Sequence, residues 1–167
     1  MNVKNLLAWV EENRDQLKPP VGNKEIYPQD DIIVMAVGGP NTRKDYHYNE
    51  TPEFFYQVQG DITLKIIQDG EFKDVQIKEG DIYVLNAKVP HSPQRPADTI
   101  GLVIEQRRQE NHKDGFQWYC ENCQTLLHEE YFHLTDIEKQ LPAVFKKFNA
   151  NTDLHTCKNC GHHNQFP

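Results

Sequence analysis

The chain has 167 residues, of which 37% are hydrophobic and 26% charged, and its 18 basic and 25 acidic side chains give a formal charge of −7. This composition is typical of a globular protein, and the length fits one domain of ordinary size with a small appendage. It argues against a nucleic-acid partner, because binding a phosphate backbone normally requires a basic surface. We also expect no membrane partner, because no apolar run approaches the roughly 20 residues that span a bilayer.

The first twenty residues predict an amphipathic helix that ends before the prolines at 19–20. Its apolar side chains recur at helical spacing, at Val3, Leu6, Leu7 and Val10. Acidic residues interrupt the apolar stretch and no small-residue cleavage site follows it, so we expect no signal peptide and a cytoplasmic protein.

Residues 26–108 predict a series of short antiparallel strands. Strand-like segments separated by turn residues lie at 32–37, 54–60, 62–70, 72–81, 82–86 and 99–107. Asp69-Gly70, between the third and fourth of these, indicates a tight hairpin. Short strands at this spacing favour a mainly β fold, a sandwich or a barrel, including the jelly roll.

The character of the sequence changes after Arg108, and residues 109–115 resemble a linker. We therefore expect residues 1–108 to form a barrel with an N-terminal helix, and residues 109–167 to form a small metal-binding appendage containing short helices. Within the appendage, Ile137, Leu141, Phe145 and Phe148 recur at helical spacing. Pro142 inside that pattern predicts a kink or a break into two short helices.

All the cysteines of the chain belong to two Cys-x2-Cys pairs, Cys120 with Cys123 and Cys157 with Cys160. Two such pairs offer four thiolates to one tetrahedral ion, as in zinc ribbons and mononuclear iron–thiolate sites. Because sulfur would close all four positions, the ion should be structural. The spacing leaves zinc and iron as alternatives. A redox dithiol and four unrelated cysteines are other interpretations, and the second matching pair disfavours both.

A second group of possible ligands lies at strand edges within the β region, and it resembles the two motifs of cupin barrels. The sequence reads Gly39-x5-Asp45-x-His47-x5-Glu53-x6-Gly60 and Gly80-x5-Asn86-x-Lys88-x2-His91-x3-Arg95. Asp45 stands where the first motif usually has its first histidine. The remaining set, His47, Glu53 and His91, has two histidines and one carboxylate, which would leave positions on Fe(II) open for substrate and O2.

Polar residues around these ligands indicate an acidic substrate. Arg43 precedes His47 and Arg95 follows His91, in each case by four residues, and a guanidinium pairs bidentately with a carboxylate. Glu105 could orient or deprotonate a bound group. Asp45 shares a strand face with His47 and could be a ligand, but we favour a supporting role for it, because the other three already complete a site.

Several segments together resemble the 3-hydroxyanthranilate 3,4-dioxygenase family, a family of cupins. They are KPPVGN (18–23), VGGPN (37–41), DYH (45–47), EFFYQ (53–57), EGD (79–81) and HSPQRP (91–96). DGFQWYCENC (114–123) and CKNCG (157–161) are similar to its bacterial form, which carries an additional four-cysteine metal site. The likeness covers nearly the whole chain. Asn86-Ala87 departs from it, in a loop that is often richer in proline.

This resemblance implies a cupin double-stranded β-helix and an Fe(II)-dependent extradiol-type dioxygenase. Such an enzyme opens the ring of 3-hydroxyanthranilate with O2 to give 2-amino-3-carboxymuconate semialdehyde, which becomes quinolinate. The reaction belongs to tryptophan breakdown through kynurenine and to NAD biosynthesis. A small aromatic acid and O2 would be its partners. Separately, an exposed β edge and the appended metal-binding lobe lead us to expect a homodimer.

The resemblance also implies roles for individual residues. His47, Glu53 and His91 would bind Fe(II), and a second iron or zinc ion would occupy the cysteine site. Arg43 and Arg95 would hold the substrate carboxylate or the oxygen species. Glu105 would act near the amino and hydroxyl groups, and Asn23 would contact the substrate or oxygen pocket.

Two other classes of protein fit parts of the pattern. A cupin isomerase or sugar sensor would use the metal only structurally, but neutral sugars do not require Arg43 and Arg95. An interaction module built around the cysteines could bind nucleic acid, but the charge of −7 and the absence of a basic run near the cysteine pairs disfavour it.

Overall fold

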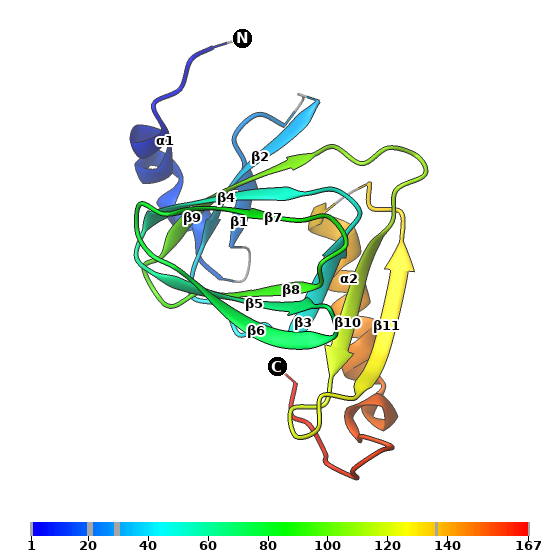
Figure 1. Cartoon of the computed structure of the whole chain (residues 1–167). Coiled ribbons are helices and arrows are strands. Elements are labelled where there is room, and N and C mark those ends of the chain that lie inside the picture. Colours follow the sequence, from blue (N-terminus) through cyan, green and yellow to red (C-terminus); the bar gives the residue numbers. More distant parts are fainter. Residues whose placement is uncertain (1, 20–21, 29–30, 136, 167) are drawn as a thin grey trace.

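The computed structural model describes residues 2–19, 22–28, 31–135 and 137–166, so Pro20 of the predicted helix stop lies outside the described residues. Two antiparallel sheets face each other and form a barrel (Figure 1). The five-stranded sheet has the order β1-β2-β9-β4-β7, and the six-stranded sheet the order β11-β10-β3-β8-β5-β6. The prediction of a mainly β, cupin-type jelly-roll barrel is confirmed.

Each sheet is built from strands that are not consecutive in the sequence, and four helical segments accompany them. The first sheet consists of β1 (Asn23–Glu25), β2 (Ile32–Gly38), β9 (Ile100–Gln106), β4 (Glu53–Gln59) and β7 (Ile82–Leu85). The second consists of β11 (Leu126–Phe132), β10 (Asp114–Tyr119), β3 (Asp45–Asn49), β8 (His91–Gln94), β5 (Ile62–Gln68) and β6 (Glu71–Ile77). The helices are α1 (Leu6–Asn13), α2 (Ile137–Ala150) and the 3-10 turns η1 (Arg14–Leu17) and η2 (Thr152–His155).

Alternating side chains of the strands form the core between the sheets. Along β4 and β5 every second residue is buried at first, as expected for strands with one face toward a core. Phe55 and Val103 from one sheet and Leu64 and Ile66 from the other join the same apolar cluster. At the predicted hairpin, Asp69 and Gly70 both have positive φ, 55° and 77°, as the tight two-residue turns that join β-hairpins require. That prediction is also confirmed.

The predicted N-terminal helix is present, but its predicted apolar face is partly wrong. The Asn5 side chain accepts a hydrogen bond from Ala8 N and starts α1 there, which leaves Val3 outside the helix and fully exposed. Leu7 is 67% exposed because it faces away from the sheet. The predicted Val10 is buried and the predicted Leu6 packs beside it; with Leu17 they attach this segment to the outside of the five-stranded sheet (Figure 1).

The C-terminal residues are joined to the barrel by a continuous sheet. β10 pairs with β3, and β11 pairs with β10, so this hairpin extends the six-stranded sheet beyond the barrel (Figure 1). The predicted linker at 109–115 is too long, because β10 already begins at the fully buried Asp114. The division into domains at residue 108 stays a prediction.

Helix α2 lies against this extension and continues through Pro142, so the predicted break into two helices is wrong. Val144 and Phe148 pack with Phe116 and Trp118 of β10, and the rings of Trp118 and Phe148 stack 4.2 Å apart. Fully burying one such side chain contributes about 1.5–3 kcal/mol. Several of them offset the roughly 3 kcal/mol that a proline costs inside a helix.

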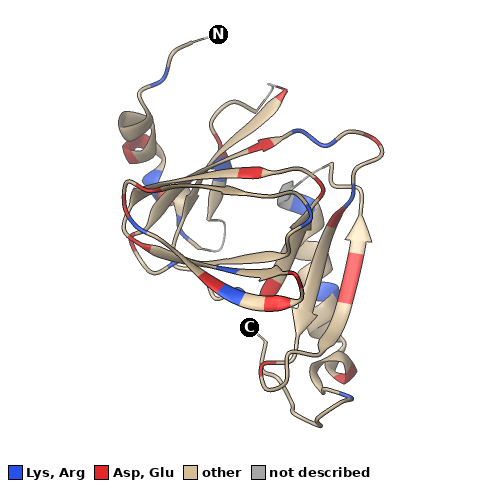
Figure 2. Cartoon of the chain, in the orientation of Figure 1, with Lys and Arg blue, Asp and Glu red and all other residues tan. Residues whose placement is uncertain are grey.

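Basic and acidic residues are interspersed along the chain rather than being gathered by sign. Basic positions are scattered among acidic ones along both sheets (Figure 2). Within the described residues, no helix combines the length and the apolar character needed to cross a bilayer.

Candidate active site

A pocket between the two sheets is lined by polar side chains that come from distant parts of the sequence. The structure brings all the predicted catalytic and substrate-binding residues to it, together with the three predicted metal ligands. These residues are Asn23, Arg43, His47, Glu53, His91, Arg95 and Glu105. Apolar side chains close the rest of its wall, among them Phe55, Phe116, Leu134 and Leu141. The last two belong to the C-terminal part of the chain.

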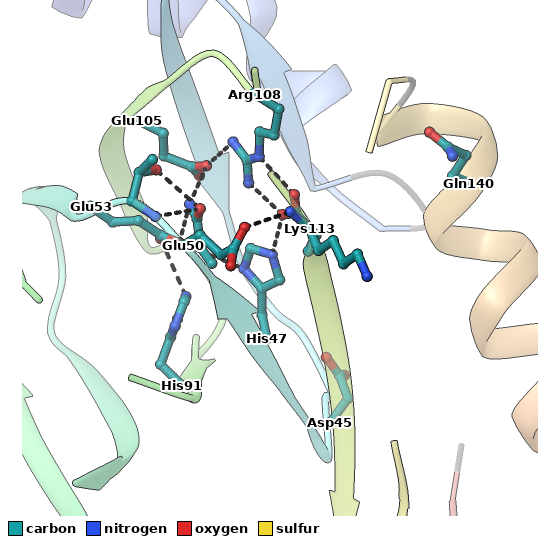
Figure 3. A network of polar contacts seen from close by, with 12 residues as sticks. Asp45, His47, Glu50, Glu53, His91, Glu105, Arg108, Lys113 and Gln140 are labelled. Atoms are coloured by element: carbon teal, nitrogen blue, oxygen red, sulfur yellow. Dashed lines mark hydrogen bonds and ion pairs between the residues drawn. The ribbon is translucent and has the colours of Figure 1, made fainter. Parts of the chain in front are cut away.

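His47, Glu53 and His91 point toward one another in this pocket (Figure 3). His47 on β3 lies opposite His91 on β8, and Glu53 begins β4 on the other sheet. Glu53 Oε1 is 3.6 Å from His47 Nδ1, and Glu53 Oε2 is 3.2 Å from His91 Nε2. Atoms about 2.1 Å from one ion and on adjacent octahedral corners lie about 3.0 Å apart. The three side chains therefore fit one metal ion.

The second nitrogen of each imidazole ring has a partner that fixes the ring. His47 Nε2 lies 2.7 Å from Asp114 Oδ2, and His91 Nδ1 lies 3.1 Å from the carbonyl oxygen of Val89. These contacts leave His47 Nδ1 and His91 Nε2 free for an ion, the arrangement usual for metal-binding histidines. Burial opposes ionisation of Glu53, but the two histidines prevail and lower its pKa to about 2.

Asp45 belongs to an ion pair with Arg43 rather than to the ligand group. Arg43 Nε lies 3.2 Å from Asp45 Oδ1, and a second contact joins Arg43 Nη2 to Asp45 Oδ2. The group of ligand atoms within 4.8 Å of one another contains His47, Glu53 and His91 without Asp45. The charge of Arg43 is thus balanced within the protein.

Arg95 differs from Arg43, because within the described residues no carboxylate forms an ion pair with it. Its side chain is 3% exposed, its Nε has no hydrogen-bond partner, and Nη1 reaches only Gln57 Oε1 at 3.4 Å. Burial and the neighbouring Arg43 lower the pKa of Arg95 to about 10. Gly101 gives this guanidinium room, since a Cβ there would lie 2.7 Å from Arg95 Nη1. A buried cation of this kind is costly unless an anion joins it.

Glu105 stands beside the ligand group and is connected to it through Asn49. The Asn49 amide donates to Glu53 Oε1 at 3.1 Å and to Glu105 Oε2 at 3.2 Å. Burial and the charge of Glu53 raise the pKa of Glu105 to about 7, against the opposing effect of Arg108. Near neutral pH this carboxylate can therefore either accept or release a proton.

Two residues of this site with buried side chains, Arg108 and Asp114, were not predicted from the sequence. Arg108 contacts both Glu105 and Asp114 (Figure 3). Asp114 begins the segment DGFQWYCENC, which carried part of the family resemblance, and that was its only signal in the sequence. One partner, His47, lies far away in the sequence on β3, and the other, Arg108, precedes Asp114 across a segment that resembles a linker.

The four cysteines form a separate group at the end of the β10–β11 extension. The Sγ atoms of Cys120 and Cys160, and those of Cys123 and Cys157, lie 3.6 Å apart, and all four lie within 4.8 Å of one another. Metal–sulfur bonds of about 2.3 Å place the sulfurs of a tetrahedral site about 3.8 Å apart. The group therefore fits one ion coordinated by four thiolates.

An antiparallel two-sheet barrel with two histidines and a carboxylate directed into its interior defines a cupin with a candidate metal site. The comparisons with known proteins go further. The model of a family named 3-HAO, described as 3-hydroxyanthranilic acid dioxygenase, matches residues 1–149, and the chain belongs to this family.

Individual relatives agree with this assignment. The chain is 52% identical over 163 residues to the 3-hydroxyanthranilate 3,4-dioxygenase of Xanthomonas euvesicatoria, covering 98% of this chain and 92% of that protein. It is 50% identical over 157 residues to the protein of the same name from Candida albicans, covering 94% and 91%. Among solved structures, a protein from Neisseria meningitidis has a TM-score of 0.50 at 17% identity, covering 64% of this chain and all of that one. This last likeness is one of fold.

Proposed function

We propose that this protein is an Fe(II)-dependent 3-hydroxyanthranilate 3,4-dioxygenase. It would open the substrate ring with O2 to give 2-amino-3-carboxymuconate semialdehyde, which cyclises to quinolinate. Membership of the family supports this proposal, and the observation that carries it is the buried Arg95, with which no carboxylate of the described residues pairs, beside the His47, Glu53 and His91 group. A cupin acting on neutral sugars would have no use for that cation.

In this proposal His47 Nδ1, His91 Nε2 and the carboxylate of Glu53 hold the iron. When bound, the ion supplies Lewis acidity that lowers the pKa of the substrate hydroxyl, together with open positions for substrate and O2. Asp114 and the Val89 carbonyl keep the two imidazole rings in the tautomers that ligation needs.

The remaining pocket residues would bind and orient the substrate. Arg95 pairs with its carboxylate, and Arg43, already balanced by Asp45, supplies a second donor near the ligands. Phe55 and Leu134 offer apolar surface to the ring and exclude water, and Asn23 contacts the substrate or O2 at the rim. Glu105 accepts the proton of the ring hydroxyl at its carboxylate, for which a pKa of about 7 is suitable.

A direct assay tests the proposed activity. The protein is loaded anaerobically with Fe(II) and mixed with 3-hydroxyanthranilate and oxygenated buffer. We expect one O2 consumed for each substrate lost, with a ring-opened product seen by absorbance and mass spectrometry. 2-Aminophenol, which lacks the carboxylate, should react with a much lower kcat/KM. A protein with full iron occupancy and no ring-opened product would contradict the proposal.

The variant Arg95→Met should lower kcat/KM for 3-hydroxyanthranilate about 100-fold, mainly through KM. This factor corresponds to about 3 kcal/mol for a lost charge-assisted pair with the substrate carboxylate. The variant should unfold at or above the wild-type temperature, because it removes a buried charge that has no carboxylate partner in the described part of the chain. Steady-state kinetics and thermal unfolding measure both effects.

Arg107→Met is the matched control for Arg95→Met, because Arg107 is partly exposed and its guanidinium contacts Glu25 outside the pocket. Its kinetics should equal those of the wild type. For 2-aminophenol, Arg95→Met should lose almost nothing, since that compound has no carboxylate. An equal loss with both compounds would show that Arg95 does not bind the carboxylate.

Several finer features belong to the same proposal. The four cysteines would hold a structural zinc or iron ion, and residues 1–108 and 109–167 would form the catalytic barrel and its metal-stapled appendage. The enzyme would act in the cytoplasm as a homodimer, with no nucleic-acid or membrane partner. Elemental analysis of the purified protein and its mass in solution test the ion and the dimer.

A further inference from the structure

A buried polar network beside the pocket centres on Arg108, to which the proposed reaction assigns no part. Arg108 Nε lies 2.9 Å from Asp114 Oδ1, Nη2 lies 2.6 Å from Asp114 Oδ2, and Nη1 contacts Glu105 Oε2 (Figure 3). The side chain of Arg108 is 5% exposed, and that of Asp114 is fully buried. One guanidinium therefore joins two carboxylates that come from β9 and β10.

The same Asp114 carboxylate also fixes a proposed metal ligand. Its Oδ2 lies 2.7 Å from His47 Nε2, so an unbroken series of contacts runs from Glu105 through Arg108 and Asp114 to His47. β10 holds Asp114 in place by pairing with β3, where Asp114 lies opposite Asn49 and Phe116 opposite His47. The ring of Phe116 stacks on that of His47 at 5.2 Å.

The network connects a proposed metal ligand, His47, with a proposed proton acceptor, Glu105, and so can affect both. A carboxylate that accepts the Nε2 proton of His47 keeps Nδ1 deprotonated and directed at the ion. The bidentate pair with Arg108 fixes the plane of that carboxylate, which a single point charge would not do. At the other end, the same guanidinium holds the carboxylate of Glu105 at the pocket wall.

We propose that Arg108 is a positioning residue that orients His47 through Asp114 and, through its other arm, orients Glu105. The His47 arm concerns metal binding and stands without any particular substrate. The Glu105 arm rests on the proposed function. The two arms are therefore tested by separate measurements.

The metal arm is tested with the variants Arg108→Gln and Arg108→Lys and with Co(II) as the probe. Affinity is measured by competition with a chelator and coordination by the visible spectrum, after the thiolate site has been filled with zinc. We expect Arg108→Gln to weaken Co(II) binding about 10- to 100-fold, the usual effect of losing a residue that orients a ligand. Its spectrum should differ from that of the wild type. Arg108→Lys keeps a charge without the bidentate geometry and should lie between the two.

A matched control and two further variants separate positioning from general stability. Arg107→Gln changes the neighbouring arginine, which contacts Glu25 away from the pocket, and should bind Co(II) like the wild type. If Arg108 acts through Asp114, the double variant Arg108→Gln/Asp114→Asn should bind Co(II) about as weakly as Asp114→Asn alone. In Arg108→Gly, added guanidinium at millimolar concentration should restore part of the affinity and the spectrum.

The result that would overturn the metal arm is a folded Arg108→Gln or Arg108→Lys protein with a wild-type spectrum and a Co(II) dissociation constant within twofold of the wild type. If Arg108→Gln does not fold, the lysine variant decides. For the Glu105 arm, Fe(II)-saturated Arg108→Lys should show a lower kcat for 3-hydroxyanthranilate with little change in KM, and an unchanged kcat would overturn that arm. Absence of turnover in the wild type, with weakened Co(II) binding in the variants, would refute the proposed function and leave the metal arm standing.

Discussion

Replacing His47 with alanine should remove both the pocket ion and ring-opening activity, while the thiolate-bound ion remains. His47 is one of three proposed ligands, and its ring is held by Asp114 and by stacking on Phe116. Alanine leaves two ligands on a site that was already open on one side, and the buried Asp114 loses its contact with the imidazole while keeping its pair with Arg108. We expect the metal content to fall from two ions to one, and kcat/KM to fall at least 1,000-fold, equivalent to about 4 kcal/mol. Elemental analysis and oxygen uptake measure the two effects.

The control for this variant is His112→Ala, which changes a half-buried residue in the loop between β9 and β10 that is not among the pocket residues. It should retain both ions and full activity. Loss of the cysteine-bound ion in His47→Ala, or retention of the pocket ion at wild-type affinity, would show that the two sites are not independent as proposed.

Replacing Cys157 with serine should have the opposite effect on the two ions. Cys157 is buried, and its Sγ lies 3.6 Å from that of Cys123. Serine is a poor ligand for a thiolate site, so the ion should be lost and the free energy of unfolding should fall by about 5 kcal/mol, as is typical when a structural metal is removed. Chemical denaturation and elemental analysis of the folded fraction measure both. Lys158→Ser, an exposed change at the next position, should leave both unchanged.

The pocket ion should remain in Cys157→Ser, but activity should fall in part. Phe116 lines the pocket and packs at a ring distance of 5.0 Å against Phe145 of α2. Helix α2 leads through η2 to Cys157, and it contributes Leu141 to the pocket wall. A weakened C-terminal segment therefore affects the substrate wall before the ligands. If Cys157→Ser lost the pocket ion first, the proposed separation of the sites would be wrong.

Much of the fold and of the candidate site could be predicted because the signals are local. Alternation along 62–66 and the Asp69-Gly70 turn predict two paired strands, and each depends only on neighbouring residues. The spacing of His47 and Glu53 and of the two cysteine pairs likewise reflects short hairpins and turns. Once the turns that carry the two cysteine pairs meet, tetrahedral coordination by four sulfurs leaves little freedom in where the side chains lie.

Other features could not be predicted because they depend on contacts between distant segments. A proline such as Pro142 normally interrupts a helix. Here the packing of Val144 and Phe148 against β10 maintains α2 through it. Val3 and Leu7 fit an apolar stripe but are exposed, whereas Leu6, Val10 and Leu17 pack toward the sheet. Arg43 and Arg95 are equivalent in the sequence, and only the position of Asp45 shows which of them is balanced.

The sequence by itself determined the β architecture, the resemblance to a family and the residue types at both candidate metal sites, since these depend on periodicity and spacing along one strand or turn. Only the tertiary structure decided which side chains surround the ligands. Asp114 and Arg108 are more than sixty residues from His47 in the chain, and the pairing of β10 with β3 brings Asp114 to within 2.7 Å of it. Because these side chains are buried, water does not screen their contacts, and each contact is stronger than it would be at the surface. A buried charge without such a partner would destabilise the fold.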